Sequence, residues 1–407
     1  MIPNQWKSSK TVLIFKKGDR EDIKNYRPIA LLSQPYKLFT KILLNRLERT
    51  LDDFQPVEQA GFRKNFACLD HIHTVTQVIE KTRDLELYRP GRSRAQVLEQ
   101  CNAGTTTKIK MFHKDLTIPI GKGVRQGDTI SPKLFTSALQ HAMMDLDWTD
   151  RGVAIDSRKL SNLRFADDIV LLSHSAVELQ DMVDDINEAG KRIGLCINRK
   201  KTEVMRNKWA DKTTISVDDT DLPDTDHYVY LGRRISMDND LKAEIGRRRR
   251  CAWAAMNTVK EAAHLVSDKK IRSQLFDTTV LPALCYGAET WADNKTSDML
   301  ITRTQRALER TLLGINRREQ FDKGLRSADL RQQSGIQDAV TYIRRAKHRW
   351  ATHVDVKGTL GRPATRWSDA FKSLNTPQQH WAQAAQDRNR WKACARRWDD
   401  SQPTTGV

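Results

Sequence analysis

The sequence predicts a mixed α+β fold spread over two or three domains. At 407 residues the chain is longer than one ordinary domain, and its hydrophobic content of 39% is enough for a packed core. Apolar β-branched runs, as over residues 11–15, are typical of strands, whereas apolar residues three and four apart, as over residues 36–51, are typical of helices. Both patterns recur along the chain, so we expect small sheets backed by helices.

The charge balance indicates a polyanionic partner. Lysine and arginine total 69 against 51 aspartates and glutamates, which gives a formal net charge of +18. An excess of this size most simply indicates a protein that binds nucleic acid. The six cysteines include no CxxC pair, so the sequence predicts neither a zinc site nor a disulfide framework.

The sequence predicts no membrane segment. No apolar run reaches the roughly 18 residues that cross a bilayer, and the N-terminal residues lack the apolar stretch of a signal peptide. We therefore expect an intracellular protein with no membrane partner. The chain begins almost directly with a strand-like run, so we also expect it to be a piece of a longer one.

The first 80 residues predict a strand and two helices. The strand ends in a basic turn at Lys16, which faces solvent or a phosphate. One helix is expected over residues 36–51 and a second over residues 69–80. His71 and His73 point in different directions from the second helix, because they lie two residues apart. Ordinary packing or surface histidines are therefore favoured over a metal-binding pair.

A glycine-rich segment, GVRQGD at residues 123–128, precedes the next predicted helix. Gly127 has no side chain, so it can let another backbone, a base or a sugar approach closely. A turn that simply needs a positive φ is the alternative. Ser131 and Pro132 then predict the start of a helix, with Ser131 as the N-cap.

Two adjacent aspartates lie within RFADDIVLL, residues 164–172. Polar and apolar residues alternate before them as in a half-buried strand, and IVLL after them is typical of a buried strand. Ala166, Asp167 and Asp168 are therefore predicted to form the turn of a hairpin. At a tight turn both carboxylates can project from one tip and share divalent cations. Ordinary turn residues are the alternative, because aspartate favours turns.

The segment after the aspartates predicts a helix and a strand. Ser175 and Glu178 form a capping-box pattern, and Gly194 is a typical helix stop. Residues 195–198 are predicted to form a short strand that leads into a basic turn ending at Lys201. Hairpin, helix, strand and basic turn in this order fit a palm-like sheet backed by helices.

Six sequence blocks follow one another in an order that is specific to one family. They are TVLIFKKGDREDIKNYRPIALLS, EQAGFRKNFACLDHI, GVRQGDTISPKLF, RFADDIVLLS, GLCINRKKTEVM and YVYLGRRIS. Together they resemble the reverse transcriptase of non-LTR (LINE-type) retrotransposons, across nearly the whole chain. The resemblance implies a right-hand polymerase with fingers, palm and thumb. It also implies two Mg²⁺ ions, an RNA template, a DNA primer, dNTP substrates and a nuclear location.

The resemblance assigns a role to each residue that matches a motif. Asp167 would be a catalytic metal ligand, with Asp168 in support, and Lys201 would lie near the phosphates or the leaving group. The residues assigned to nucleotide and template are Lys16, Arg27, Arg125, Gln126, Gly127 and Lys201, and those of the primer grip are Tyr230, Leu231 and Gly232. For each lysine and arginine a solvated surface charge is the alternative.

One block of the family is missing between residues 81 and 111. The family carries there a strand with its first metal aspartate, whereas this chain reads as though that strand and the next helix had been removed near residues 88–91. Asp84 is the nearest aspartate, and we expect it at the polar end of a helix. The palm sheet is therefore expected to be incomplete. We expect little or no polymerase activity, because misplacing reacting groups by ~1 Å can cost about 10²-fold in rate.

The resemblance divides the chain into four parts. Residues 1–80 would form the fingers, 81–235 the palm, 236–330 the thumb and 331–407 a basic helical C-terminal region. Within the thumb, Leu308, Leu312 and Ile315 are expected in the core. The arginines expected to follow the backbone of a nucleic-acid duplex are Arg247, Arg248, Arg249 and Arg250.

Three hypotheses about function remain open at the level of the sequence. The chain is an inactive relic of a polymerase, or a non-catalytic protein that keeps a basic groove for RNA and DNA. In the third, the omission is an error in the deduced sequence and the true product is an active enzyme. The residues present at positions 81–111 distinguish an active from an inactive polymerase. Salt-dependent affinity for RNA–DNA hybrids tests whether the chain binds nucleic acid.

Overall fold

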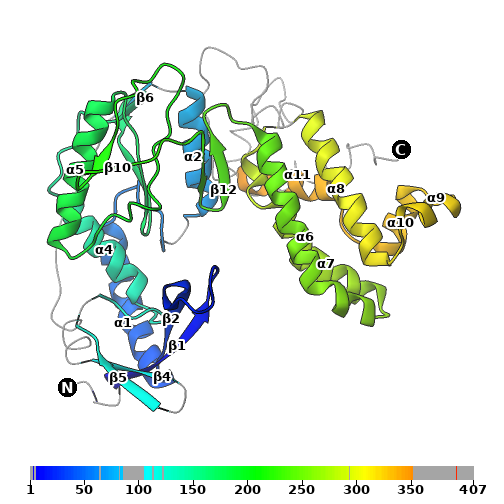
Figure 1. Cartoon of the computed structure of the whole chain (residues 1–407), viewed down its shortest axis with the longest axis horizontal. Helices are drawn as coiled ribbons and strands as arrows, with labels where there is room; N and C mark the ends of the chain where they lie inside the picture. The colour runs from blue at the N-terminus through cyan, green and yellow to red at the C-terminus, as the bar shows by residue number, and fades with distance from the viewer. Residues whose placement is uncertain are drawn as a thin grey trace. The chain divides into compact units, whose positions relative to one another are not determined.

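The chain forms two compact units. The computed structural model describes residues 3, 6–63, 66–81, 83–85, 105–111, 114–121, 123–292, 294–351 and 391. Unit 1 comprises Met1–Cys68, Lys81–Val204 and Lys208–Asp224, and unit 2 comprises Leu69–Glu80, Met205–Asn207 and Thr225–Val407. Helices and small sheets occur together along the chain (Figure 1), so the predicted mixed α+β class is confirmed. The division into four parts stays a prediction, and the expected join near residues 88–91 lies outside the described residues.

The largest sheet of unit 1 has four strands in the order β2-β1-β4-β5. β1 (Ser8–Phe15) runs antiparallel to β2 (Tyr26–Leu31) and parallel to β4 (Thr106–Met111). β5 (Lys114–Pro119) pairs antiparallel with β4. The first predicted strand is therefore confirmed. A short 3-10 helix, η2 (Ile23–Asn25), lies between β1 and β2.

Three helices of unit 1 follow the predicted periodicity. They are α1 (Gln34–Asp53), α4 (Ser131–Met143) and α5 (Ala176–Arg192). Leu139 and Met143 of α4 pack with the fully buried Met182 of α5, which places the two helices against one another.

The ends of two of these helices test the predicted caps. The N-cap of α4 is Ile130 and no side chain caps it, so the N-cap predicted at Ser131 is wrong by one residue. The Ser175 side chain accepts a hydrogen bond from the Glu178 backbone at the start of α5, as predicted. The Glu178 carboxylate instead accepts from the Gly152 backbone nitrogen at 3.1 Å, which ties α5 to the segment before β6.

The remaining strands of unit 1 form separate pairs. β3 (Arg83–Leu85) runs parallel to β6 (Val153–Leu160), and β7 (Asn162–Phe165) forms a hairpin with β8 (Asp168–Leu171). No strand among the described residues joins these two pairs into one sheet. A third pair consists of β9 (Ser216–Val217) and β10 (Thr220–Asp221).

Two predictions fail in this region. Asp84 lies on strand β3 rather than at a helix end, because α2 ends at Lys81 and the next residues pair with β6. Residues 195–198 do not form a strand. Their backbone groups form hydrogen bonds within the chain turns on either side instead of with a strand. The Leu195 nitrogen donates to the Gly190 carbonyl near the end of α5, and the Asn198 carbonyl accepts from the Lys201 nitrogen.

Unit 2 is mainly helical. It contains a hairpin of β11 (His227–Tyr230) and β12 (Arg233–Ser236). Residues 69–80 of α2 (Cys68–Lys81) also belong to unit 2, and this helix confirms the second helix predicted from the sequence. The other elements are α6 (Leu241–Leu265), α7 (Lys269–Cys285), η3 (Ala288–Thr290), α8 (Lys295–Leu313), α9 (Arg317–Asp322), α10 (Ser327–Ser334) and α11 (Ala339–Trp350).

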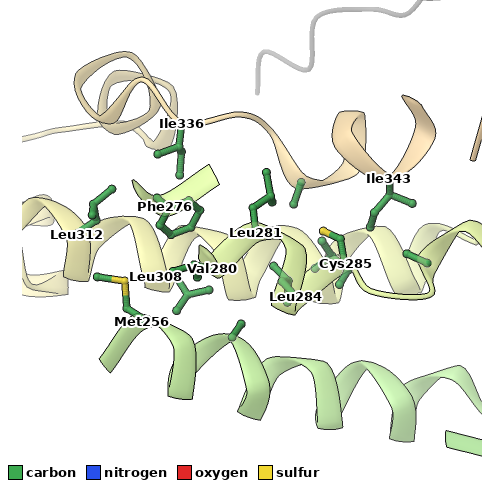
Figure 2. Packing of buried hydrophobic residues seen from close by; sticks show 14 of the residues in the cluster. Met256, Phe276, Val280, Leu281, Leu284, Cys285, Leu308, Leu312, Ile336 and Ile343 are labelled. Carbon is green, nitrogen blue, oxygen red and sulfur yellow. The ribbon is translucent and has the colours of Figure 1, made fainter. Parts of the chain in front are cut away.

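An apolar cluster holds the helices of unit 2 together. Met256 of α6, Phe276 of α7 and Leu308 of α8 are all fully buried in it (Figure 2). Leu312 is fully buried as well, whereas Ile315 is half-buried, so two of the three core positions predicted here are confirmed. None of the helices in the described part of the chain is long and apolar enough to cross a membrane.

We expect Leu308→Ala to destabilise unit 2 by about 3 kcal/mol, because it removes a buried side chain and leaves a cavity. Met299→Ala on the same helix is the control, since Met299 is 48% exposed and should cost well under 1 kcal/mol. Denaturant unfolding followed by circular dichroism measures both losses. Equal losses would contradict the assignment of this cluster as the core.

Candidate functional site

The two adjacent aspartates lie at the tip of the β7–β8 hairpin. Phe165 pairs with Asp168 across the turn, so Ala166 and Asp167 are its two central residues and Asp168 begins β8. The turn is thus one residue shorter than predicted. Ala166 is buried and has a φ of +59°, whereas Asp167 and Asp168 are both exposed.

The two carboxylates and two lysines interact electrostatically. Partial desolvation by the surrounding chain raises the pKa of Asp168, and the negative charge of Asp167 raises this pKa further. Lys201 and Lys16 act in the opposite direction and lower the same pKa. The charges of Lys16 and Lys201 therefore favour the ionised form of Asp168, and their predicted contact with phosphates stays a prediction.

The backbone of each lysine is held by a hydrogen bond. Lys16 follows β1, and its backbone nitrogen donates to the Asn25 carbonyl at 2.8 Å. Lys201 lies in the turn closed by its own hydrogen bond to the Asn198 carbonyl at 2.9 Å. Both side chains are exposed. Arg27 is exposed on β2, where it pairs with Ile14, and its contact with a nucleotide or template stays a prediction.

Gly127 occupies a position where no other residue fits. Its φ is +109°, and a Cβ atom there would lie 2.7 Å from the Ala30 carbonyl oxygen of β2. Ala30 also donates its backbone nitrogen to the Gln126 carbonyl at 2.8 Å. Both sequence-level explanations of this glycine therefore hold, because it adopts a positive φ and allows another backbone to approach. The Gln126 side chain is exposed.

Arg125 is buried, in contrast to its neighbours Gln126 and Gly127. Its guanidinium lies over the Tyr36 ring at 4.5 Å, donates to the Tyr36 hydroxyl, and lies 3.8 Å from Asp128 Oδ2. The Tyr36 hydroxyl in turn donates to Asp128 at 3.0 Å. This network fixes the segment to α1. The predicted contact between Arg125 and a nucleotide stays a prediction.

Sequence analysis missed the residues that support the aspartate hairpin. Arg164 of β7 donates its backbone nitrogen to the Glu58 carbonyl at 2.8 Å and accepts from Ala60 at 3.0 Å, so residues 58–60 lie along the free edge of β7. The buried Gln59 side chain accepts from the Ala166 nitrogen at 3.2 Å, which holds the turn itself. The pattern EQAGF was recognised as a family block, but nothing in it signals this contact.

The support of the hairpin includes a close backbone approach at Gly61 and a buried arginine side chain at Arg164. A Cβ atom on Gly61 would lie 2.4 Å from the Ala166 nitrogen. The Arg164 side chain is buried and donates to Gln140 of α4 at 2.7 Å. Burial lowers the pKa of Arg164 to about 10, against a smaller opposing effect of Glu58.

The predicted primer-grip residues lie at the turn of the β11–β12 hairpin. Tyr230 is 2% exposed, and its hydroxyl is 3.3 Å from Nδ1 of the buried His71 on α2. Leu231 and Gly232 are the two turn residues and are half-buried. The assignment of these residues to a primer stays a prediction.

The four consecutive arginines of α6 differ in their environments. Arg248 is buried and forms an ion pair with the buried Glu244 at 2.6 Å. Arg247 is half-buried, whereas Arg249 and Arg250 are exposed. The uniform role predicted for this run is not tested, but only two of its side chains lie open to a partner.

The aspartate pair fits part of a magnesium site. Carboxylate oxygens are the ligands that Mg²⁺ prefers, and this ion commonly takes its other ligands from water and substrate phosphates. Within the ranges that the structure describes, no group of three or more histidine, cysteine, aspartate or glutamate side chains could hold a metal ion. Asp167 and Asp168 therefore supply two carboxylates that suit such an ion, whose other ligands would come from water and phosphate.

Comparison with known proteins identifies the family. Residues 14–235, more than half of the chain, match the sequence profile of the reverse transcriptase (RNA-dependent DNA polymerase) family. This chain belongs to the reverse transcriptase family. The matched region contains the aspartate hairpin and all of the β11–β12 hairpin except Ser236. The resemblance stated from the sequence blocks is confirmed.

The relatives are named as proteins of transposons and retrotransposable elements. A protein of Caenorhabditis elegans described as transposon-derived is 37% identical over 272 residues, which are 60% of this chain and 98% of that protein. The Pol polyprotein of the type-1 retrotransposable element R2 of Popillia japonica is 26% identical over 71% of this chain. A protein of Drosophila melanogaster, named as the RNA-directed DNA polymerase of transposon BS, is 24% identical over 71% of this chain.

The chain spans only part of the longer relatives. It covers 45% of the R2 polyprotein and 36% of the transposon BS protein. A solved telomerase structure from Candida albicans, in complex with a TWJ fragment of telomeric RNA, aligns with 94% of this chain and 67% of that chain. The TM-score of this alignment is 0.37 and the sequence identity is 11%, so the two structures are only distantly alike.

We expect Gly61→Ala to destabilise unit 1 by about 1–3 kcal/mol, because the new methyl group would overlap the backbone of the aspartate turn. Gly121→Ala is the matched control, since nothing lies within 4 Å of a Cβ atom there. Denaturant unfolding of both variants tests this. A loss no greater for Gly61→Ala than for Gly121→Ala would show that the close approach does not exist.

We expect the pKa of Asp168, followed by NMR of its carboxyl carbon, to lie above that of an ordinary aspartate. Asp167→Asn should lower this pKa because a like charge is removed, and Lys201→Gln should raise it because an opposite charge is removed. A raised pKa means that the proton competes with a cation at higher pH. Mn²⁺ affinity should therefore fall as the pH is lowered through the titration of Asp168, and unchanged pKa values in both variants would contradict the arrangement.

Proposed function

We propose that this chain is a reverse transcriptase domain that binds an RNA template paired with a DNA primer but has little or no polymerase activity. One observation carries the proposal. Asp167 and Asp168 lie together and exposed at the tip of the β7–β8 hairpin, within the region that matches the reverse transcriptase family, whereas residues 81–111 contain no block with the family's first metal aspartate.

The chemistry depends on a metal position that the chain fills only in part. Reverse transcriptases use divalent metal ions, which would stabilise the attacking and leaving oxygens of phosphoryl transfer. Asp167 and Asp168 would hold Mg²⁺ here. Asp84 lies on β3, which pairs with β6, and in this proposal it does not replace the missing aspartate. Loss of one ligand would leave the two-ion arrangement incomplete, and misplacement by ~1 Å can cost about 10²-fold in rate.

Binding depends on different residues from catalysis. Lys16 and Lys201 would neutralise the phosphates of a nucleotide or template, and the exposed Arg27 and Gln126 would contact the same ligand. The exposed Arg249 and Arg250 would contact the duplex backbone. Each cation contributes largely on its own, so loss of one metal ligand leaves these contacts in place. A nuclear location would follow if the chain acts on genomic DNA.

Primer extension tests the catalytic half of the proposal. The purified chain and its Asp167→Ala variant are incubated with poly(rA), oligo(dT), Mg²⁺ and dTTP, and we expect no extension from either one. A chain with the family's metal strand inserted near residues 88–91 is the positive control. Extension by the unaltered chain that disappears in Asp167→Ala would overturn the claim of inactivity and favour an active enzyme.

Salt-dependent binding tests the other half. We expect affinity for an RNA–DNA hybrid to fall steeply between 50 and 200 mM salt, because phosphate contacts release counterions. In a plot of log affinity against log salt concentration, each phosphate contact contributes about 0.9 to the magnitude of the slope, so the slope gives the number of contacts. Affinity that does not change with salt would argue against a basic groove.

A further inference from the structure

The turn of the β11–β12 hairpin adopts a conformation that its sequence disfavours. Tyr230 pairs with Arg233 across a turn of two residues, and both of these have positive φ, +45° at Leu231 and +82° at Gly232. Glycine adopts this region freely, but leucine does so at a cost. Such strain persists only where surrounding contacts enforce it, and it is a reason to look for a function.

Side chains from α6 and from Tyr286, the residue that follows α7, hold both carbonyl groups of this turn. The Tyr286 hydroxyl donates to the Leu231 carbonyl at 2.7 Å. Arg247 donates to the Gly232 carbonyl at 2.7 Å through Nη1, and Arg248 donates to the same oxygen through Nη2. A carbonyl oxygen has two lone pairs, so it can accept both hydrogen bonds.

Glu244 orients the two arginines and joins them to the adjoining strand. Its carboxylate is 1% exposed, accepts from Arg248 Nε at 2.6 Å and lies 3.6 Å from Arg247 Nη1. Its other oxygen accepts from the backbone nitrogen of Arg234 on β12 at 2.9 Å. The Arg248 guanidinium also lies 4.9 Å from the centre of the Tyr286 ring. The turn and β12 are thus both attached to the first turns of α6.

We propose that Glu244, Arg247, Arg248 and Tyr286 form a clamp that fixes the β11–β12 turn to α6, so that hairpin and helix move as one body. Arg247 and Arg248 are then positioning residues. Of the four-arginine run, Arg249 and Arg250 alone contact phosphates. The inference rests on the proposed function, because the clamp would hold a primer end in fixed register with the duplex along α6.

Paired variants in the full chain separate the two roles of these arginines. Hydrogen exchange of residues 228–236 reports the clamp, and the salt slope of affinity for an RNA–DNA hybrid reports phosphate contacts. Arg247→Gln should speed exchange about tenfold, as loss of a charge-assisted hydrogen bond does, and leave the slope unchanged. Tyr286→Phe should also speed exchange, with its ring retained.

Arg249→Gln and Arg250→Gln are the matched controls on the same helix. Each should reduce the slope by about 0.9 and leave exchange of the hairpin unchanged. If Arg247→Gln reduces the slope as Arg250→Gln does and leaves exchange unchanged, Arg247 contacts phosphate and the clamp is overturned. If the unaltered chain binds no hybrid, the proposed function fails, while the exchange data still decide the clamp.

Discussion

The pairing of residues 58–60 with the edge of β7 is the constraint on which the aspartate site depends. A two-stranded hairpin alone is only marginally stable in water. Here Glu58 and Ala60 bond to the backbone of Arg164, and Gln59 holds the turn nitrogen of Ala166. These contacts keep Ala166 at positive φ and thereby present Asp167 and Asp168 together at the surface. The close approach at Gly61 is possible only because this residue has no Cβ atom.

The site concentrates charges of both signs, and this has consequences for binding and for catalysis. Lys16 and Lys201 are far apart in the sequence of unit 1. The positive charge of each lowers the pKa of Asp168, which opposes the effect of the negative charge of Asp167. Phosphate recognition needs cations near one place, and several can contribute independently. Catalysis needs every metal ligand in one geometry. The loss of a single block can therefore abolish the reaction in this family while leaving nucleic-acid binding, which is the physical basis of the proposed function.

The run Arg247 to Arg250 shows how helical phase divides four identical residues. Successive positions turn by about 100° around α6, so Arg248 faces inward above Glu244, while Arg249 and Arg250 face outward. Burying Arg248 is tolerable because Glu244 and the Gly232 carbonyl partner its charge and its donors. A charge run therefore predicts a solvated surface only where no buried partner faces it.

Local residue patterns were enough to predict the α+β class, the helices over residues 36–51 and 69–80, the aspartate hairpin and the membership in the reverse transcriptase family. These follow from consecutive residues, either through a local period or through blocks in a fixed order. Three features became visible in the folded chain alone: Arg125 and Arg248 are buried, Gln59 holds the aspartate turn, and Asp84 lies on a strand beside β6. Each of these features depends on a partner that is distant in the sequence. A local residue pattern does not specify which distant group a side chain or strand will contact.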